Sequence, residues 1–499
     1  MELIHQLMYG FSICLQPLNL LYCFTGVLAG TLVGVLPGIG PPGALALLIP
    51  VTVKIQPESA VIMLCGIMYG AMYGGSTTSI LVNIPGEAAS VITCLDGYVM
   101  ARSGRAGAAL GIAAMGSFVA GTLSIFGLIF FAPTLARFAL RFGPPEYFSI
   151  MIFSFTILVF IAGGSVAKGL LMAVLGIAIG TIGLDPTAGI NRFTFNLPYL
   201  MDGVGLVQAV IGLFGVSEIL FSLDQYVKRD IYETKLKGLF PTLQDWKESI
   251  LPILRGTGIG FFLGTIPGIG VLLPTFLSYG LEKRISKDPG KFGKGFIGGV
   301  AAPEAANNAA AGGTLIPMLS LGIPTGASTA IVLGALMIYG IQPGPLLIKE
   351  APQVFWGLVS SLYFGNIMLL ILNLPLIGLW VKVLKIPYRL LSVFILIFCL
   401  IGSYGIGYSA ADIVIMSLFG LIGYIAKKTE FELTPMVFGL VLGPMIENAL
   451  RRSLVISNGS FGIFFTRPIS LVFIGISILF FLWTCIGRKR LPAVGEESL

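Results

Sequence analysis

Long apolar runs constrain this chain more than any other feature, because about 20 apolar residues in a helix cross the hydrocarbon core of a bilayer. The runs Tyr147 to Gly164 and Pro468 to Gly487 approach or reach that length. Apolar residues make up 56% of the 499 residues and charged residues only 11%, unlike a soluble domain. The sequence therefore predicts an all-α polytopic membrane protein with about 10–14 transmembrane helices, some of them re-entrant or discontinuous.

Charge, cysteine and histidine usage exclude several function classes. The net charge of +7 comes from Lys and Arg in short loops between apolar runs, which anchors membrane helices, so we expect no nucleic-acid partner. The six cysteines are scattered singly and His5 is the only histidine, so we expect neither a transition-metal site nor an intramembrane enzyme. The glycine-rich run Pro37 to Gly43 lacks the lysine of a phosphate-binding loop. No organic cofactor is expected.

The chain repeats itself. When the sequence is shifted by 239 residues, Gly74 to Ser90 align with Gly313 to Thr329. A shift of 230 residues aligns seven identical positions of another block. These are Gly26, Gly30, Gly34, Pro37, Gly38, Ile39 and Gly40, which fall on Gly256, Gly260, Gly264, Pro267, Gly268, Ile269 and Gly270. Two unusual blocks in the same order favour duplication over chance matches among glycines. We expect a first membrane repeat over 1–222, a polar linker over 223–249, a second repeat over 250–465, and a last transmembrane helix with a basic tail over 466–499.

Loop charges predict how the two copies are oriented. The connection after the first break carries only Lys54, whereas its counterpart carries five basic residues, Lys283, Arg284, Lys287, Lys291 and Lys294. The connection after the second block has the opposite bias, with Arg102 and Arg105 in the first copy and no basic residue from 339 to 348 in the second. Because basic loops stay cytoplasmic, equivalent loops lie on opposite sides, and the repeats are predicted to be inverted.

Both copies carry helix-breaking residues inside an apolar run. Bare backbone at membrane depth is tolerated only where it lines a cavity or is buried in protein, so these breaks predict a site. Free N–H groups at a helix start attract carboxylates, and free carbonyls at a helix end coordinate cations. We expect cation binding or coupling at Pro37, Gly38, Gly40, Pro267, Gly268 and Gly270. The alternative is that the glycines only permit close helix contact.

A polar run follows the first break. About ten residues separate Gly75 from Pro85, roughly 15 Å of helix or half a bilayer, which predicts a half-helix bounded by Gly74-Gly75 and Pro85-Gly86. Its polar side chains, Ser76, Thr77, Thr78, Ser79 and Asn83, are neutral donors that avoid the cost of burying a lysine. The alternative is that these residues form ordinary interhelical hydrogen bonds.

A second unusual run, Ala302 to Thr314, contains Glu304 and the adjacent amides Asn307 and Asn308 among small residues. An ionisable group inside a membrane is expensive, which favours a coupling role for Glu304 and, just after Pro85-Gly86, for Glu87. The alternative is that both acids only begin helices, where the helix dipole favours them.

Four motifs, "GTLVGVLPGIGP", "YGGSTTSILVNIPGEAASV", "APEAANNAAAGGTLIPMLSLGIP" and the second "GTIPGIG", resemble the large membrane subunit of the tripartite tricarboxylate transporters. The resemblance runs from about residue 20 to 345. It implies a multi-pass secondary transporter in the bacterial inner membrane that works with a small four-span membrane subunit. A periplasmic binding protein would deliver citrate or a related carboxylate, and a cation gradient, usually sodium, would drive uptake.

The resemblance also implies a substrate site. Its residues would be Ser76, Thr77, Thr78 and Asn83 in the first copy and Asn307, Asn308, Gly312, Gly313, Thr314 and Thr325 in the second. Thr325 departs from the pattern, because it stands where a second "IPG" would have glycine. The alternatives are a stand-alone cation-coupled organic anion carrier and a passive anion channel, although no charged ring of a channel is present. Elevator-like and rocking motions of the repeats both fit the sequence.

Overall fold

The computed structural model describes residues 2–36, 38–161, 165–185, 188–224 and 238–487. Pro37, residues 225–237 of the expected linker and the basic tail from residue 488 lie outside the described residues. In the described part, seven helical segments are long and apolar enough to cross a membrane, and six shorter apolar helices accompany them. The regular structure is almost entirely helical, which confirms the all-α polytopic class.

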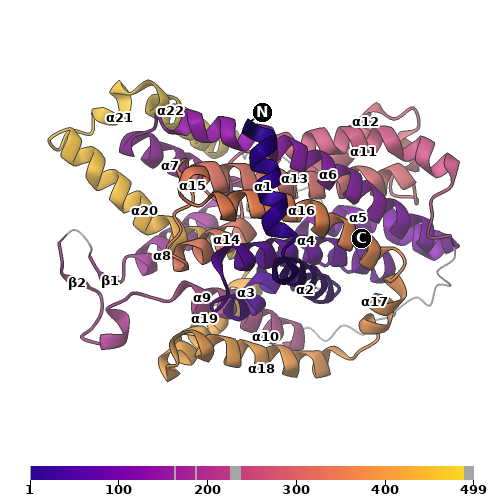
Figure 1. Ribbon diagram of the computed structural model, residues 1–499, viewed down its shortest axis with the longest axis horizontal. Coiled ribbons are helices and arrows are strands. Elements are labelled where there is room, and N and C mark those ends of the chain that lie inside the picture. Colours follow the sequence, from indigo (N-terminus) through magenta and orange to yellow (C-terminus); the bar gives the residue numbers. More distant parts are fainter. Residues whose placement is uncertain (1, 37, 162–164, 186–187, 225–237, 488–499) are drawn as a thin grey trace.

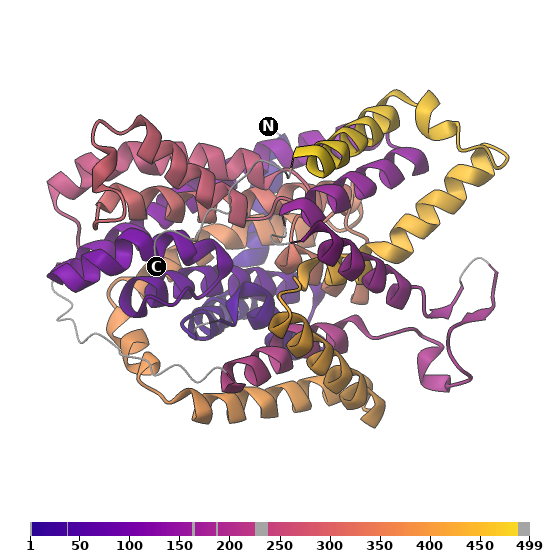
Figure 2. The same ribbon diagram turned by 180° about the vertical axis from the view of Figure 1, so that it is seen from behind.

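The first half of the chain is built from helices and one small hairpin (Figure 1). In chain order they are α1 (Glu2–Cys14), α2 (Pro17–Gly34), α3 (Gly40–Thr52), α4 (Pro57–Val82), η1 (Ala88–Ser90), α5 (Val91–Met100), η2 (Ala101–Arg105), α6 (Ala106–Ala139), α7 (Pro144–Ile161), α8 (Val166–Gly180), β1 (Gly183–Leu184), β2 (Asn191–Arg192), η3 (Pro198–Leu200), α9 (Leu206–Val210), η4 (Ile211–Val216) and α10 (Ser217–Asp224). β1 and β2 pair antiparallel and stand away from the helices at the edge of the molecule (Figure 2).

The second half follows a similar order without that hairpin. It contains α11 (Leu243–Gly264), α12 (Leu272–Ile285), η5 (Pro289–Lys291), α13 (Ile297–Leu321), α14 (Ala327–Ile338), α15 (Leu347–Glu350), α16 (Pro352–Asn373), α17 (Ile377–Leu384), α18 (Tyr388–Gly407), α19 (Ala410–Lys428), α20 (Thr434–Ile456), α21 (Ile463–Thr466) and α22 (Pro468–Gly487). The repeated blocks of the sequence form α2, α3, α4 and η1–α5 in the first half and α11, α12, α13 and α14 in the second.

The repeated glycines pack helices against each other. α2 lies along α4, and a β-carbon built on Gly30 would approach the carbonyl oxygen of Ile67 to 2.3 Å. α11 lies along α13 in the same way, and a β-carbon on Gly260 would come within 2.2 Å of the carbonyl oxygen of Ala306. Glycines spaced four residues apart therefore let each pair of backbones touch, as small residues do in membrane helices.

Both predicted breaks are present, and they have the same backbone shape. α2 ends at Gly34, and beyond it Gly38 and Gly40 have φ of 91° and 59°. α11 ends at Gly264, after which Gly268 and Gly270 have φ of 87° and 65°. Only glycine adopts such angles without a steric cost, which is why both copies keep it there.

The prediction of a helix break at Gly74-Gly75 is wrong, because α4 runs without interruption from Pro57 to Val82. A β-carbon on Gly74 would lie 2.5 Å from the carbonyl oxygen of Thr31, so this glycine serves close packing of α4 on α2. The helix ends instead at Asn83, whose left-handed φ of 58° matches the 70° of Gly322, 239 residues later. Pro85 and Gly86 do fall in the interruption that follows.

The two halves interleave. α6 packs along α13 and also against α16 and α11, all in the other half, and α16 packs on α4. Connections also pair crosswise, since the Tyr339 hydroxyl beyond α14 donates to the Thr52 carbonyl at the end of α3. Likewise, Asp96 in α5 accepts hydrogen bonds from the backbone N–H groups of Gly293 and Gly295, in the basic connection after α12. Inversion of the repeats relative to a bilayer stays a prediction.

Candidate functional site

A cavity of about 850 Å³ lies where the two breaks meet. Its wall contains residues 38–42 of the first break and 268–272 of the second. Residues 87–89 and 325–329, which begin η1 and α14, complete that part of the wall. Four chain interruptions, two from each half, thus present backbone groups to one space of the size of a small-molecule site.

The two helix starts at the cavity use the same hydrogen bonds. The Ser90 hydroxyl accepts from the backbone N–H of Glu87 at 3.2 Å, and the Thr329 hydroxyl accepts from that of Gly326 at 3.0 Å. Ser90 and Thr329 are 239 residues apart, so the repeat extends to the side chains that close each turn. The equivalent of Glu87 is Gly326, and only the first copy offers a carboxylate at this position.

Glu304 is buried in α13, with 1% of its surface exposed. Its carboxylate accepts hydrogen bonds from the Ser76 hydroxyl at 2.6 Å and the Thr93 hydroxyl at 2.5 Å. No Lys or Arg pairs with it in the described part of the chain. A carboxylate in such surroundings needs a proton or a bound cation, because two hydroxyls do not compensate a full charge.

One helical turn further, the Asn307 amide donates to the Glu87 carboxylate at 2.7 Å. The Asn308 amide donates to the Ser117 hydroxyl at 2.7 Å. The side-chain oxygens of both asparagines are buried, and neither has a hydrogen-bond partner among the described residues. Carboxylates and side-chain amide oxygens are the types of donor that hard cations bind in proteins.

The residues predicted from the sequence do not all face this space. Glu87, Thr314 and Thr325 line the cavity, as do Gly38, Gly40, Gly268 and Gly270. Ser76, Asn307, Asn308 and Glu304 form the buried cluster beside it.

The remaining predicted residues lie elsewhere. Thr77 is buried in α4, the Thr78 hydroxyl bonds to the Gly75 carbonyl of its own helix, and Asn83 caps α4 and is exposed. A β-carbon on Gly312 would lie 2.2 Å from the Ser124 hydroxyl, and one on Gly313 would lie 2.5 Å from the Phe261 carbonyl oxygen. Those two glycines are where α13 contacts α6 and α11.

Sequence reasoning missed an ion pair on the cavity wall, between Glu218 in α10 and Lys427 at the end of α19. Glu218 stands inside an apolar segment, Leu206–Asp224, that qualifies as a membrane span. An acid in such a segment is itself a signal of function. Lys427 gave no comparable signal, because a lysine at the end of a helix is ordinary.

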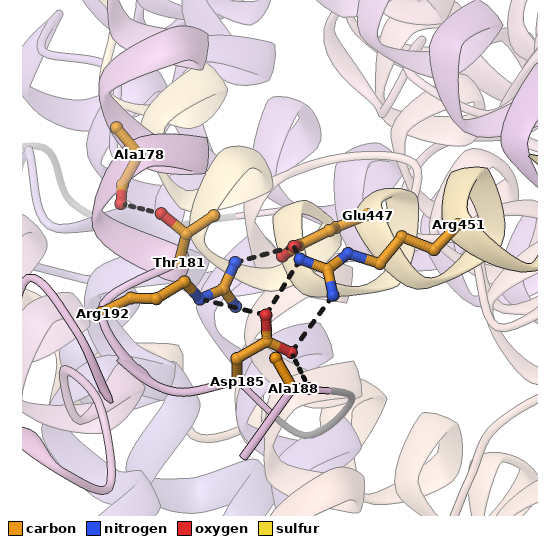
Figure 3. Close-up of polar contacts among 7 residues, drawn as sticks. All are labelled: Ala178, Thr181, Asp185, Ala188, Arg192, Glu447 and Arg451. Carbon is orange, nitrogen blue, oxygen red and sulfur yellow. Dashed lines mark hydrogen bonds and ion pairs between the residues drawn. The ribbon is translucent and has the colours of Figure 1, made fainter. Parts of the chain in front are cut away.

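A second charged cluster lies away from the cavity (Figure 3). Asp185, beside β1, pairs with Arg451 of α20 at 2.9 Å, and Glu447 pairs with both Arg451 and Arg192 at 2.7 Å. Figure 3 shows the two guanidinium groups lying between the two carboxylates. This cluster fastens the β1–β2 hairpin to α20, and none of its four residues lines the cavity.

Comparisons with known proteins find several similar sequences. An uncharacterized 52.8 kDa protein of the TAR-I ttuC' 3' region of Agrobacterium vitis is 46% identical over 501 residues and covers all of both chains. An uncharacterized TAR-II protein of the same organism is 45% identical over 238 residues, 48% of this chain and 96% of its own. The uncharacterized protein MJ1079 of Methanocaldococcus jannaschii is 25% identical over 435 residues, 85% of this chain and 97% of its own.

No solved structure matches the chain. The model of the tripartite tricarboxylate transporter TctA family matches residues 20–438, which include both breaks, both helix starts and the buried cluster. This multi-pass membrane protein therefore belongs to the tripartite tricarboxylate transporter TctA family.

Proposed function

We propose that the chain is the large transmembrane subunit of a tripartite secondary transporter that imports a tricarboxylate or a related, citrate-like carboxylate. One observation carries the proposal, namely the cavity in which both repeated breaks and both helix starts meet. Helix starts supply N–H groups for carboxylates, and broken backbone supplies carbonyls for a cation. Discontinuous helices from two repeats around one site are typical of secondary transporters.

The coupling ion is proposed to be sodium or a proton, held near Glu304 and Glu87. The Glu304 carboxylate has two hydroxyl donors and no basic partner among the described residues. Its buried charge would therefore be neutralised by a bound cation or by a proton. The unpartnered oxygens of Asn307 and Asn308 support a metal cation. The broken backbone would contribute carbonyl ligands, and the first break lies beside Glu87, since a β-carbon on Gly40 would be 3.5 Å from the Glu87 β-carbon.

The partners are proposed from the family. They are a small four-span membrane subunit and a periplasmic binding protein that delivers the carboxylate, and the location is the bacterial inner membrane. A membrane location is supported by the seven long apolar segments in the described part of the chain.

The test is uptake of radiolabelled citrate, and then of succinate, into proteoliposomes that hold the chain and its small subunit, with the binding protein outside. An inward sodium gradient, a pH gradient and no gradient are compared. We expect saturable uptake that requires one of the gradients. Absence of uptake of either acid under every gradient would refute the proposal.

The same vesicles separate the alternatives. Full uptake without either partner would favour a stand-alone carrier. Uptake that rises linearly with concentration and ignores the gradients would favour a passive anion channel.

A further inference from the structure

The ion pair between Glu218 and Lys427 touches the first break. A β-carbon on Gly38 would lie 2.4 Å from Oε1 of Glu218, so this carboxylate rests against the bare backbone of the break. The Ser222 hydroxyl donates to the same oxygen at 3.0 Å, and the Lys427 ammonium contacts the other oxygen. The pair joins α10 of the first half to α19 of the second.

Among the described residues, no such pair touches the second break. There, a β-carbon on Gly268 would meet the backbone carbonyl oxygen of Ser154 at 2.4 Å. The two breaks match in backbone shape but differ in what covers them, a charged pair on one and neutral backbone on the other. Formal charge at the breaks is therefore concentrated on the first one.

The cavity wall is otherwise acidic. Its charged residues in the described part of the chain are Glu87, Glu218, Glu430 and Glu432 against one basic residue, Lys427. A carboxylate that enters meets an excess of negative charge, and Lys427 offers the one ammonium with which it can pair. Both residues line the cavity, and the Lys427 side chain is 22% exposed against 9% for Glu218, so the lysine is the more accessible member of the pair.

We propose that Lys427 binds a carboxylate group of the substrate, and that Glu218 is the counter-ion which the substrate displaces. This inference rests on the proposed transport function. The exchange replaces one carboxylate by another at the same ammonium, so the pairing of Lys427 is kept. Glu218 is then left beside the broken backbone with an uncompensated charge, which a further cation or a proton neutralises, in addition to the coupling ion proposed near Glu304 and Glu87.

The test measures the KM of citrate uptake, or of succinate uptake where succinate is the acid transported, in the reconstituted three-component system. Lys427→Gln removes the ammonium, and we expect KM to rise at least about 10-fold, in line with the loss of a charge-assisted hydrogen bond. Glu218→Gln removes the competitor, and we expect KM to fall about 3-fold or more. Lys427→Arg keeps the positive charge, so its KM should stay close to that of the parent protein.

The neighbouring pair, Lys428 with Asp224 at 3.0 Å, is a matched control because neither residue lines the cavity. Lys428→Gln and Asp224→Asn should leave KM unchanged. If the Glu218–Lys427 pair had a merely structural role, Lys427→Gln and Glu218→Gln would change KM in the same direction and both would lower the thermal stability. That result would overturn the inference. Equal KM values for Lys427→Gln and Lys428→Gln in vesicles whose parent protein transports would overturn it as well. Failure of the parent protein to transport would instead refute the proposed function.

Discussion

Ser76 and Glu304 lie 228 residues apart, in opposite halves of the chain, and are joined by a 2.6 Å hydrogen bond from the hydroxyl to the carboxylate. The Thr93 hydroxyl donates a hydrogen bond to the other carboxylate oxygen. The most buried acid of the site, in the second half, is thus held by two hydroxyls of the first half. Any movement of one repeat against the other acts directly on this carboxylate.

Glu304→Gln tests the coupling role of that carboxylate. The amide keeps the size of the side chain but carries no charge, so a coupling ion held there would lose its partner. We expect gradient-driven uptake to fall at least about 10-fold, the effect of roughly 1.4 kcal/mol, whereas exchange of labelled for unlabelled substrate persists. Glu350→Gln, at the exposed end of α15, is the control. Normal gradient-driven uptake by Glu304→Gln would refute the role.

Gly260→Ala tests the close packing of α11 on α13. The new β-carbon would lie 2.2 Å from the carbonyl oxygen of Ala306, which must move. We expect a loss of about 1–3 kcal/mol, the usual cost of overpacking, seen as a lower midpoint of thermal unfolding in detergent. Gly258→Ala on the same helix meets nothing within 4 Å and should be neutral or slightly stabilising. Equal midpoints for the two variants would contradict the packing role.

The inverted orientation is tested by labelling single cysteines in a cysteine-free background. Gln56 and Lys287 occupy equivalent connections of the two copies and are exposed. We expect a membrane-impermeant reagent to reach them from opposite sides of the membrane. Gln342 should label from the same side as Gln56, because Tyr339 bonds to Thr52. Modification of Gln56→Cys and Lys287→Cys from one side would rule out inversion.

Arg451→Gln tests the cluster that fastens the β1–β2 hairpin. Asp185 is only 4% exposed at its side chain, so the loss of this partner leaves a covered charge less well compensated. We expect amide hydrogen exchange in β1 and β2 to quicken about 10-fold, which corresponds to roughly 1.4 kcal/mol of lost local stability. Uptake should be retained, because the cluster lies off the cavity. The neighbouring Arg452→Gln should leave exchange unchanged, and unaltered exchange in both variants would contradict the anchoring role.

The repeated glycines allowed the breaks to be predicted, because the spacing of Gly30 and Gly38 recurs at Gly260 and Gly268 and only glycine suits the positive φ of Gly38 and Gly268. The same reasoning failed at Gly74-Gly75. A glycine that ends a helix and a glycine that lets two helices touch look alike in one sequence. Only the partner helix, here α2, distinguishes them.

The pairing of Glu218 with Lys427 could not be predicted from sequence. The two residues are 209 positions apart, and their meeting depends on how α10 packs against α19. The polar run after the first break was identified as a whole, yet its members separate in the structure. Ser76 points to Glu304, whereas the Thr78 hydroxyl satisfies its own helix. Helical phase decides which of these hydroxyls faces a neighbour, and the phase depends on tertiary packing.

The interleaving of the two halves has a consequence for how such a chain is made. α6 has its main neighbours, α13, α16 and α11, in the other half, so a half-chain synthesised alone would expose the surface along which α6 and α13 touch. Neither half possesses a complete interior of its own. The cavity wall likewise draws one break and one helix start from each half, so a half-chain alone would supply only part of the wall.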